Sequence, residues 1–300
     1  MGITNIQWCA RHTVHPTGKC PHGATGEERC LDVECERCWV KGYSANLWIG
    51  CTPVSEACRN CWAEGVSLRM GLDVWGRRAD RRLTGDAVFA SVAAWNKKAE
   101  KTGQRRGVFW EDMGDLFEDR PEFEERRVRA FAAMEAAPGL DHMLLTKRPE
   151  NVLLMVPPYW INGEGWPSQV WMGATVEDGQ TAFERTHHIV EWSAHGATTF
   201  ISAEPLLGNL LAAGPLVGVD LMIIGGESGP GARPFDLGAA EALVRDASDA
   251  GAAVFMKQMG SRRASATGRG LLRKGASHGQ DPYRWPEWAR RRELPVVGGA

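Results

Sequence analysis

The sequence predicts an α/β protein, namely a partial or complete (β/α) barrel with parallel strands and a Cys/His-rich, metal-stapled insertion at its N-terminus. Two observations predict the barrel: short apolar runs alternate with stretches of helical character, and polar groups follow each run. A third observation predicts the metal, because all eight cysteines lie within the first 61 of 300 residues.

Composition and charge narrow the class of protein. With 43% hydrophobic residues the chain can bury a large core, and a net charge of −2 excludes a uniformly basic nucleic-acid-binding protein. No apolar run is long enough to cross a bilayer and the N-terminus lacks signal-peptide order, so we expect a cytoplasmic protein without disulfides. Three parts are expected: residues 1–46, the barrel at 47–260, and a basic tail at 261–300.

The N-terminal part has the composition of a metal-stapled segment. Cys35 and Cys38 have the two-residue spacing that grips one tetrahedral metal ion, and Cys20 and Cys30 would complete a four-thiolate site, with His22 as a substitute ligand. A closed zinc site is the leading interpretation of this segment, and a second iron–sulfur cluster is its alternative.

Seven apolar runs are predicted to be strands buried on both faces. They are Leu47–Ile49, Gly107–Trp110, His142–Leu145, Val170–Gly173, Thr198–Ile201, Asp220–Ile224 and Ala252–Met256. Helices are predicted at Trp62–Met70, Glu122–Ala136, Gln180–Ala194 and Leu237–Ala250. Strand order cannot be read from the pattern, so an open doubly wound sheet remains an alternative.

Polar groups after the strands predict one shared catalytic rim, because active sites of parallel barrels form at the carboxyl ends of the strands. They are Cys51; Glu111, Asp112 and Asp115; Thr146, Lys147 and Arg148; Thr175 and Glu177; Ser202 and Glu204; Glu227 and Ser228; Lys257 and Gln258. Salt bridges within the rim are one interpretation of the lysines, and recognition of phosphate or carboxylate by Lys147, Arg148 and Lys257 is the other.

The strongest chemical signal is the trio Cys51, Cys58 and Cys61. Three closely spaced thiolates can wrap a cubane [4Fe-4S] cluster and leave one iron open to a small molecule, while the helix after Cys61 eases the negative charge. A structural zinc site that borrows a fourth ligand from the N-terminal part is the alternative.

A glycine-rich turn and several basic runs complete the candidate features. Gly225 and Gly226 allow close backbone approach, and Glu227 in this turn could accept hydrogen bonds from an ammonium group or a ribose hydroxyl. The basic runs could serve a polyanion such as DNA or RNA only if they converge in space. They are Arg77, Arg78, Arg81 and Arg82; Lys97, Lys98, Lys101, Arg105 and Arg106; and Arg290–Arg292.

Ordered motifs along most of the chain resemble the phage three-cysteine-motif proteins, a family described as similar to radical S-adenosylmethionine (SAM) enzymes. The motifs are Ile6–Trp8, Gly50–Thr52, Cys58–Glu64, Met113–Phe117, Leu144–Pro149, Gly173–Glu177, Ser202–Gly208, Gly225–Pro234 and Lys257–Gly260. The resemblance implies a partial barrel that holds a [4Fe-4S] cluster on Cys51, Cys58 and Cys61, with SAM on the open iron.

The sequence therefore leads to the hypothesis of a cytoplasmic radical SAM-type enzyme. Glu204, Ser202 and the turn Gly225–Ser228 would hold SAM, and Asp115, Lys147 and Lys257 would face the substrate, with Glu204 also a catalytic candidate. The phage context and the basic runs suggest a base of DNA or RNA as the substrate, and the reaction needs an external electron donor. A zinc-dependent nucleic-acid-binding protein without redox activity, or a hydrolase using the rim carboxylates, are the rival hypotheses.

Overall fold

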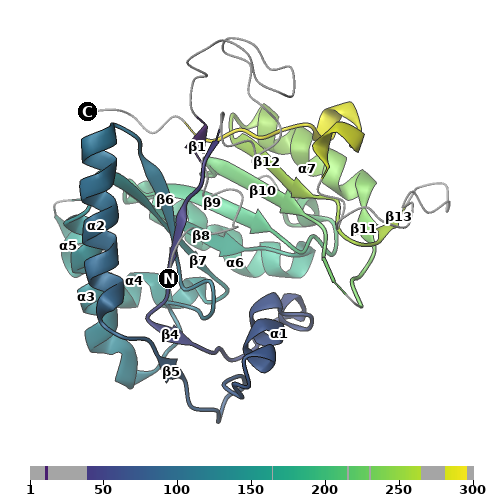
Figure 1. The fold of residues 1–300 in the computed structure, drawn as a ribbon. Helices are drawn as coiled ribbons and strands as arrows, with labels where there is room; N and C mark the ends of the chain where they lie inside the picture. The colour runs from purple at the N-terminus through teal and green to yellow at the C-terminus, as the bar shows by residue number, and fades with distance from the viewer. Residues whose placement is uncertain are drawn as a thin grey trace. The chain divides into compact units, whose positions relative to one another are not determined.

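The fold is built on a seven-stranded sheet whose strands alternate with helices (Figure 1). The structure is a computed structural model, and it describes residues 11–12, 39–163, 165–214, 216–229, 231–264 and 281–295. The order of the strands in this sheet is β12-β10-β9-β8-β7-β6-β3. Their bounds are β3 Tyr43–Ala45, β6 Arg106–Trp110, β7 Leu140–Thr146, β8 Val170–Thr175, β9 Thr198–Ala203, β10 Leu221–Gly225 and β12 Ala253–Gln258. The predicted α/β class is confirmed.

The order of the strands distinguishes the predicted topologies. Strands that follow one another along the chain are neighbours, and the β3–β6, β6–β7, β9–β10 and β10–β12 pairs are parallel. Among the described residues β3 and β12 are the two ends of the order, so the sheet is open, and the order never reverses as it would in a doubly wound sheet. This topology is consistent with the partial (β/α) barrel, and the doubly wound alternative was wrong.

The first predicted strand, Leu47–Ile49, does not belong to the main sheet. The first strand of the main sheet is β3, which pairs with β6 from Tyr43↔Val108 to Ala45↔Trp110. Leu47 instead donates its N–H to the Glu111 carboxylate and accepts from Thr84 N. Trp48–Ile49 forms β4, which pairs antiparallel with β5, Arg82–Leu83. An edge strand has one neighbour and alternates in burial, so β3 lacks the continuous apolar run that the prediction required.

Four of the seven described α-helices were predicted from the sequence. The seven helices are α1 Trp62–Arg69, α2 Ala87–Thr102, α3 Glu124–Glu135, α4 Val152–Met155, α5 Pro158–Asn162, α6 Gly179–Ala194 and α7 Leu237–Asp249. The four predicted helices correspond to α1, α3, α6 and α7, with ends that differ by at most two residues. None of the described helices is both long enough and apolar enough to cross a membrane.

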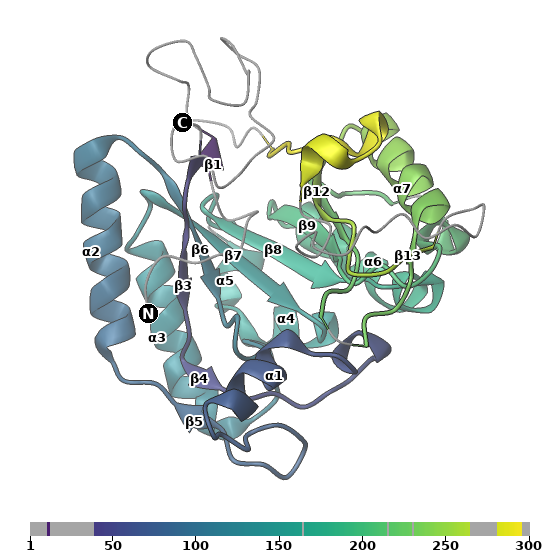
Figure 2. The ribbon, with the colours of Figure 1, turned by 45° about the vertical axis from the view of Figure 1, so that its right-hand side comes forward.

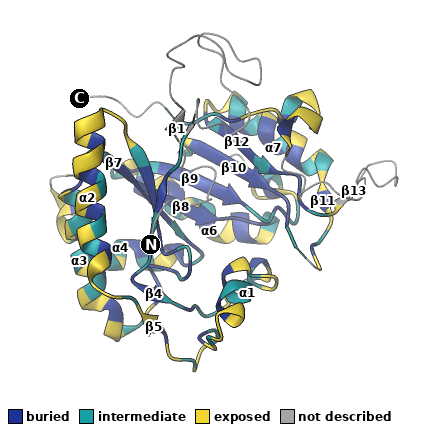
Figure 3. Ribbon diagram, viewed as in Figure 1, coloured by how far each residue is buried: buried dark blue, intermediate teal, exposed yellow. Residues whose placement is uncertain are grey.

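The chain divides into two compact units, and the boundary falls between Gly173 and Ala174 within β8. The first unit contains Val40–Gly173 and therefore β3, β6, β7 and the start of β8, whose order can be followed in Figure 2. In this unit α2 packs on α3 and β7 and leaves its outer face exposed (Figure 3). Trp48 stacks on Phe123 at 4.0 Å between ring centroids in the core.

A buried histidine lies within β7 of the first unit. His142 Nδ1 accepts a hydrogen bond from Trp110 Nε1 at 3.1 Å, and His142 Nε2 lies 3.1 Å from Ala137 O. These contacts suit the neutral ring with its proton on Nε2. Burial lowers the pKa of His142 from 6.5 to about 4.

Acid should therefore destabilise the protein through His142. Between pH 6.5 and about pH 4, His142 is protonated in the unfolded chain but stays neutral in the folded chain. The free energy of unfolding therefore falls as the pH falls. The expected loss is about 3 kcal/mol. His142→Asn retains an acceptor for Trp110 and is expected to be less stable at pH 7 but to lack this extra loss. Urea denaturation of both proteins at pH 7 and pH 4 measures the difference, and parallel losses would contradict the assignment.

The second unit contains Ala174–Ala194 and the described residues from Thr198 onward. Asp236 caps α7 by accepting from Gly238 N and Ala239 N, and the buried face of α7 packs against β10 and β12. The short strand β11, Phe235–Asp236, pairs with β13, Arg263–Ala264. A further two-stranded sheet, which is not confined to the second unit, is formed by β1, Arg11–His12, and β2, Trp39–Val40.

The described end of the predicted basic tail adds to β12. Phe255 forms an antiparallel bridge with Arg292, whose guanidinium lies 4.8 Å from the centroid of the Phe255 ring and 5.1 Å from that of Trp285. Arg292 and Trp285 are both buried. The third basic run thus uses Arg292 for packing rather than for contact with solvent.

Candidate functional site

The three candidate ligand cysteines lie on the loop that leads from β4 into α1, in the first unit. Cys58 closes a short 3₁₀ turn, Cys61 N donates to Cys58 O at 3.2 Å, and Cys61 is the residue that precedes the first turn of α1. All three cysteines are free and half-buried. Val54 N donates to Cys58 Sγ at 3.5 Å, a contact that withdraws electron density from sulfur.

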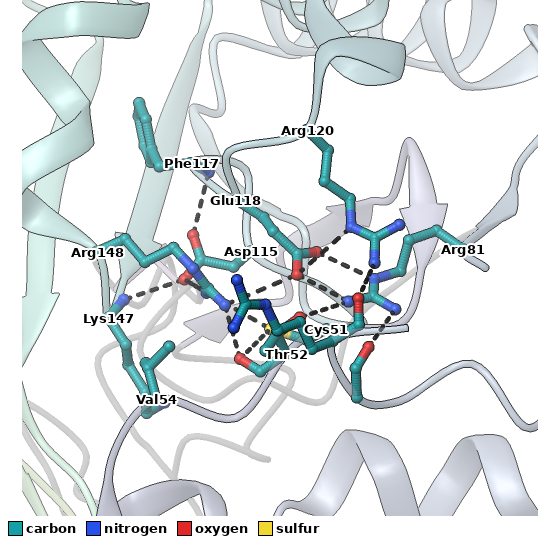
Figure 4. Close-up of polar contacts among 12 residues, drawn as sticks. Cys51, Thr52, Val54, Arg81, Asp115, Phe117, Glu118, Arg120, Lys147 and Arg148 are labelled. Carbon is teal, nitrogen blue, oxygen red and sulfur yellow. Dashed lines mark hydrogen bonds and ion pairs between the residues drawn. The ribbon is translucent and has the colours of Figure 1, made fainter. Parts of the chain in front are cut away.

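Cys51 lies against a buried arginine. Arg148 Nη1 lies 3.6 Å from Cys51 Sγ and donates to Asp115 Oδ2 at 2.8 Å, while Arg148 Nη2 donates to Thr52 O at 2.6 Å (Figure 4). The side chains of Arg148 and Asp115 are only 8% and 6% exposed. One guanidinium therefore joins the end of β7 to the start of the cysteine loop.

A second buried arginine holds the same loop from the other direction. Arg81 Nε and Nη2 donate to the two carboxylate oxygens of Glu118 at 3.0 and 2.7 Å, and Arg81 Nη2 also donates to Thr52 Oγ1 at 2.8 Å. The Arg81 side chain is fully buried and that of Glu118 is 5% exposed. Arg148 and Arg120 approach Glu118 Oε1 at 3.7 and 3.9 Å, so Thr52 lies in a network of charged groups.

The charges of this network shift the pKa of its members. Burial and the nearby Asp115 carboxylate raise the pKa of the Cys51 thiol to about 12, against the opposing effect of Arg148. Burial would raise the pKa of Glu118, but the hydrogen bonds from Arg81 and Thr52 outweigh it and the pKa is lowered. Burial would lower the pKa of Arg148, yet Asp115 and Cys51 raise it. Without a metal, Cys51 is therefore a neutral thiol at physiological pH.

Of the predicted catalytic residues in this unit, Asp115 is part of the network. Its Oδ1 accepts from Phe117 N and Thr146 Oγ1, and its Oδ2 accepts from Lys147 N at 3.1 Å as well as from Arg148. Lys147 contributes its backbone N–H to this network, and its side chain is half-buried. A contact between the Lys147 side chain and a substrate stays a prediction. Asp115 thus organises the end of β7 (Figure 4).

The second unit brings together another set of predicted residues. Lys257 Nζ donates to Glu204 Oε2 at 2.8 Å, and Gln258 Nε2 donates to Glu204 Oε1 at 3.2 Å and to Gly226 O at 3.0 Å. Ser202 is buried on β9. The Lys257–Glu204 pair agrees with the salt-bridge interpretation of the rim lysines, and the catalytic roles of both residues stay predictions.

The glycine-rich turn of this unit is packed by the protein itself. A Cβ on Gly225 would lie 3.2 Å from Glu204 Cγ, and a Cβ on Gly226 would lie 2.8 Å from both Met259 O and Gly260 N. Glu227 is bound by Arg233, whose Nη2 and Nε donate to its two carboxylate oxygens at 2.6 and 3.1 Å. Internal packing therefore explains both glycines. Recognition of SAM by this turn, including Ser228, stays a prediction.

Of the two predicted metal sites, the structure describes only the one on Cys51, Cys58 and Cys61. Cys20, Cys30, Cys35 and Cys38 lie outside the described residues, so the zinc or second-cluster prediction is untested there. Within the described ranges, no three side chains of His, Cys, Asp or Glu are gathered in an arrangement that would hold a single metal ion. The loop of Cys51 and Cys58 has the donors, as unpaired thiols, without a preformed cage for one ion.

The sequence reasoning missed two residues of the network. Arg81 was placed in a basic run as a solvated or nucleic-acid-binding residue, but it is buried, whereas its neighbours Arg77, Arg78 and Arg82 are exposed. Glu118 was not singled out at all. The available signal was the spacing Asp115-x-x-Glu118 directly after a strand, with one arginine at the end of the next strand to pair with it.

Comparison with known proteins identifies a different family from the one that the motifs suggested. A family model described as "Protein of unknown function (DUF5131)" matches residues 35–282. The searches of curated proteins and of solved structures give no match. The resemblance to the phage three-cysteine-motif proteins was therefore wrong as a family assignment, because the family model that matches residues 35–282 is that of DUF5131.

Proposed function

This chain belongs to the DUF5131 family of proteins of unknown function. From its cysteines, and not from its family, we propose that it is an iron–sulfur enzyme of radical SAM type. Three unpaired thiols on one loop, those of Cys51, Cys58 and Cys61, are the observation that carries the proposal. In this proposal they hold a [4Fe-4S] cluster, and the fourth iron stays open to SAM. When bound, the cluster would supply one electron to SAM and so give a deoxyadenosyl radical.

The chemistry of the donor set supports a cluster on this loop. The thiols are not consumed in disulfides, and the N–H of Val54 already donates to Cys58 Sγ. Cys61 lies at the N-terminus of α1, where the helix dipole favours a thiolate. Ligation deprotonates a thiol outright, so the raised pKa of Cys51 does not prevent it from becoming a ligand.

The chain's own residues hold the loop for this task. Arg81 and Arg148 bind Thr52 from two directions, through its hydroxyl and its carbonyl oxygen respectively. Glu118 and Asp115 keep these guanidinium groups in place and screen them from water. Preorganised, buried donors of this kind cost little reorganisation when charge on the sulfur changes. An external electron donor and a DNA or RNA substrate belong to the proposal as well.

Analysis of iron and deoxyadenosine tests the proposal. Protein reconstituted without oxygen should contain iron and acid-labile sulfide in the ratio of a [4Fe-4S] cluster, and should form deoxyadenosine from SAM in the presence of dithionite. Alanine at Cys51, Cys58 or Cys61 should abolish deoxyadenosine formation, whereas the control Ser91→Ala, on α2, should keep it. Zinc without iron or sulfide in the wild-type protein would instead favour the zinc-dependent alternative, and iron without SAM cleavage would remove the radical chemistry.

A further inference from the structure

Arg148 has contacts that go beyond those of a residue that only stabilises the fold. Its guanidinium touches Cys51 Sγ, Asp115 Oδ2 and Thr52 O at 3.6, 2.8 and 2.6 Å. Its own N–H donates to Thr146 Oγ1 at 2.9 Å, and Thr146 Oγ1 donates to Asp115 Oδ1 at 2.7 Å. The backbone and side chain of Arg148 are thus tied to one carboxylate, so the guanidinium is held at the sulfur.

The contact with sulfur distinguishes Arg148 from the other arginines of the network. Arg81 is held by Glu118, and Arg120 lies 3.1 Å from Glu122 and 3.9 Å from Glu118. Arg148 is held by Asp115 and also lies 3.6 Å from Cys51 Sγ. A buried arginine is the cation best suited to pair with an anionic ligand at this position.

We propose that Arg148 is a positioning residue for the Cys51 ligand, which it orients through Thr52 and whose charge it neutralises. The inference rests on the proposed function and deepens it. A positive charge 3.6 Å from a ligand sulfur favours the reduced cluster, because reduction by one electron adds negative charge. Arg148 therefore raises the reduction potential of the cluster and strengthens its retention, as outer groups around a metal site do.

Three variants separate these effects. Arg148→Gln removes both the positive charge and the planar guanidinium group. Arg148→Lys keeps the charge but lacks the two terminal nitrogens that donate to Thr52 O and to Asp115 at the same time. Arg127→Gln is the matched control, because Arg127 is also a buried arginine but donates to Leu116 O and Glu118 O instead of Cys51. Circular dichroism confirms that each variant is folded before it is reconstituted without oxygen.

Two measurements on the reconstituted proteins test the inference. Iron retention under a chelator should fall by about 10- to 100-fold in Arg148→Gln and in Arg148→Lys, and stay near wild type in Arg127→Gln. In a dithionite titration followed by electron paramagnetic resonance, the midpoint potential should shift to more negative values in Arg148→Gln and move little in Arg148→Lys.

The outcomes distinguish the inference from the function on which it rests. A wild-type protein that takes up no iron and sulfide overturns the proposed function and the inference with it. A wild-type protein with a cluster, whose retention and potential are unchanged in Arg148→Gln, overturns the role of Arg148 alone. Equal losses in Arg148→Gln and Arg127→Gln would also overturn it, because they would show a general effect of removing a buried arginine.

Discussion

Replacing Gly50 with alanine is expected to lower the free energy of unfolding by about 3 kcal/mol or more. Gly50 has φ +118°, a conformation that side chains with a Cβ rarely adopt. A Cβ there would lie 2.3 Å from Val74 O and 2.7 Å from Arg81 Cδ, so the backbone and the buried arginine would both have to move. Because Gly50 directly precedes Cys51, the variant should also take up less iron. Urea denaturation and iron analysis measure the two effects.

Gly71 provides the matched control for this substitution. Its φ is +72°, and a Cβ would meet no atom within 4 Å, so Gly71→Ala carries backbone strain without collision. The expected loss for this control is about 1–2 kcal/mol, with unchanged iron content. If Gly50→Ala is no less stable than Gly71→Ala, the close contact between Gly50 and the Val74–Arg81 segment does not exist in solution.

Breaking the Arg81–Glu118 pair is the second substitution with a large expected effect. Arg81→Met leaves the Glu118 carboxylate buried beside Thr52 without its bidentate partner, and we expect a loss of about 3–5 kcal/mol. The pKa of Glu118 is lowered in the folded chain, so the pair stabilises the protein above pH 4.5 and loses this effect as the pH falls through the folded pKa. The cost of Arg81→Met should therefore shrink in acid.

A double-mutant cycle with Glu118→Gln measures the coupling between the two groups. The double variant should lose less than the sum of the single losses, since it buries no unpaired charge. The exposed pair Arg59–Glu56, with side chains 71% and 69% exposed and 3.9 Å apart, is the control, and Arg59→Met should cost less than about 0.5 kcal/mol. Additive losses at Arg81 and Glu118, measured by urea denaturation, would contradict a direct buried interaction.

The strands that could be predicted share one property, which is burial on both faces. Each of the six correctly predicted strands is an apolar run in the sequence. Such a run is recognised without knowing which residues face which side of the sheet. β3 could not be found in this way, because Tyr43 and Ala45 are buried while Ser44 between them is not. β3 is defined by its parallel pairing with β6, and the hydrogen bond from Leu47 N to the Glu111 carboxylate lies just beyond it. Both are tertiary contacts.

For the site, the sequence indicated the ligand candidates but not what holds them. The spacing of Cys51, Cys58 and Cys61 was visible in the chain itself, and so was Asp115 after its strand. Arg81, in contrast, lies in the same short basic run as Arg78 and Arg82, which are exposed, and nothing in the local sequence distinguishes it from them. Only its position beside Glu118, 37 residues later in the chain, makes it a buried partner.

By itself, then, the sequence determined the class of fold, six strands of the main sheet, four of the seven described α-helices, and the loop that carries Cys51, Cys58 and Cys61. The tertiary structure decided which arginines are buried, which carboxylates they meet, and that Arg148 lies against Cys51. The physical reason is that apolar burial is encoded locally by periodicity, whereas the role of a charge depends on the groups that surround it after folding.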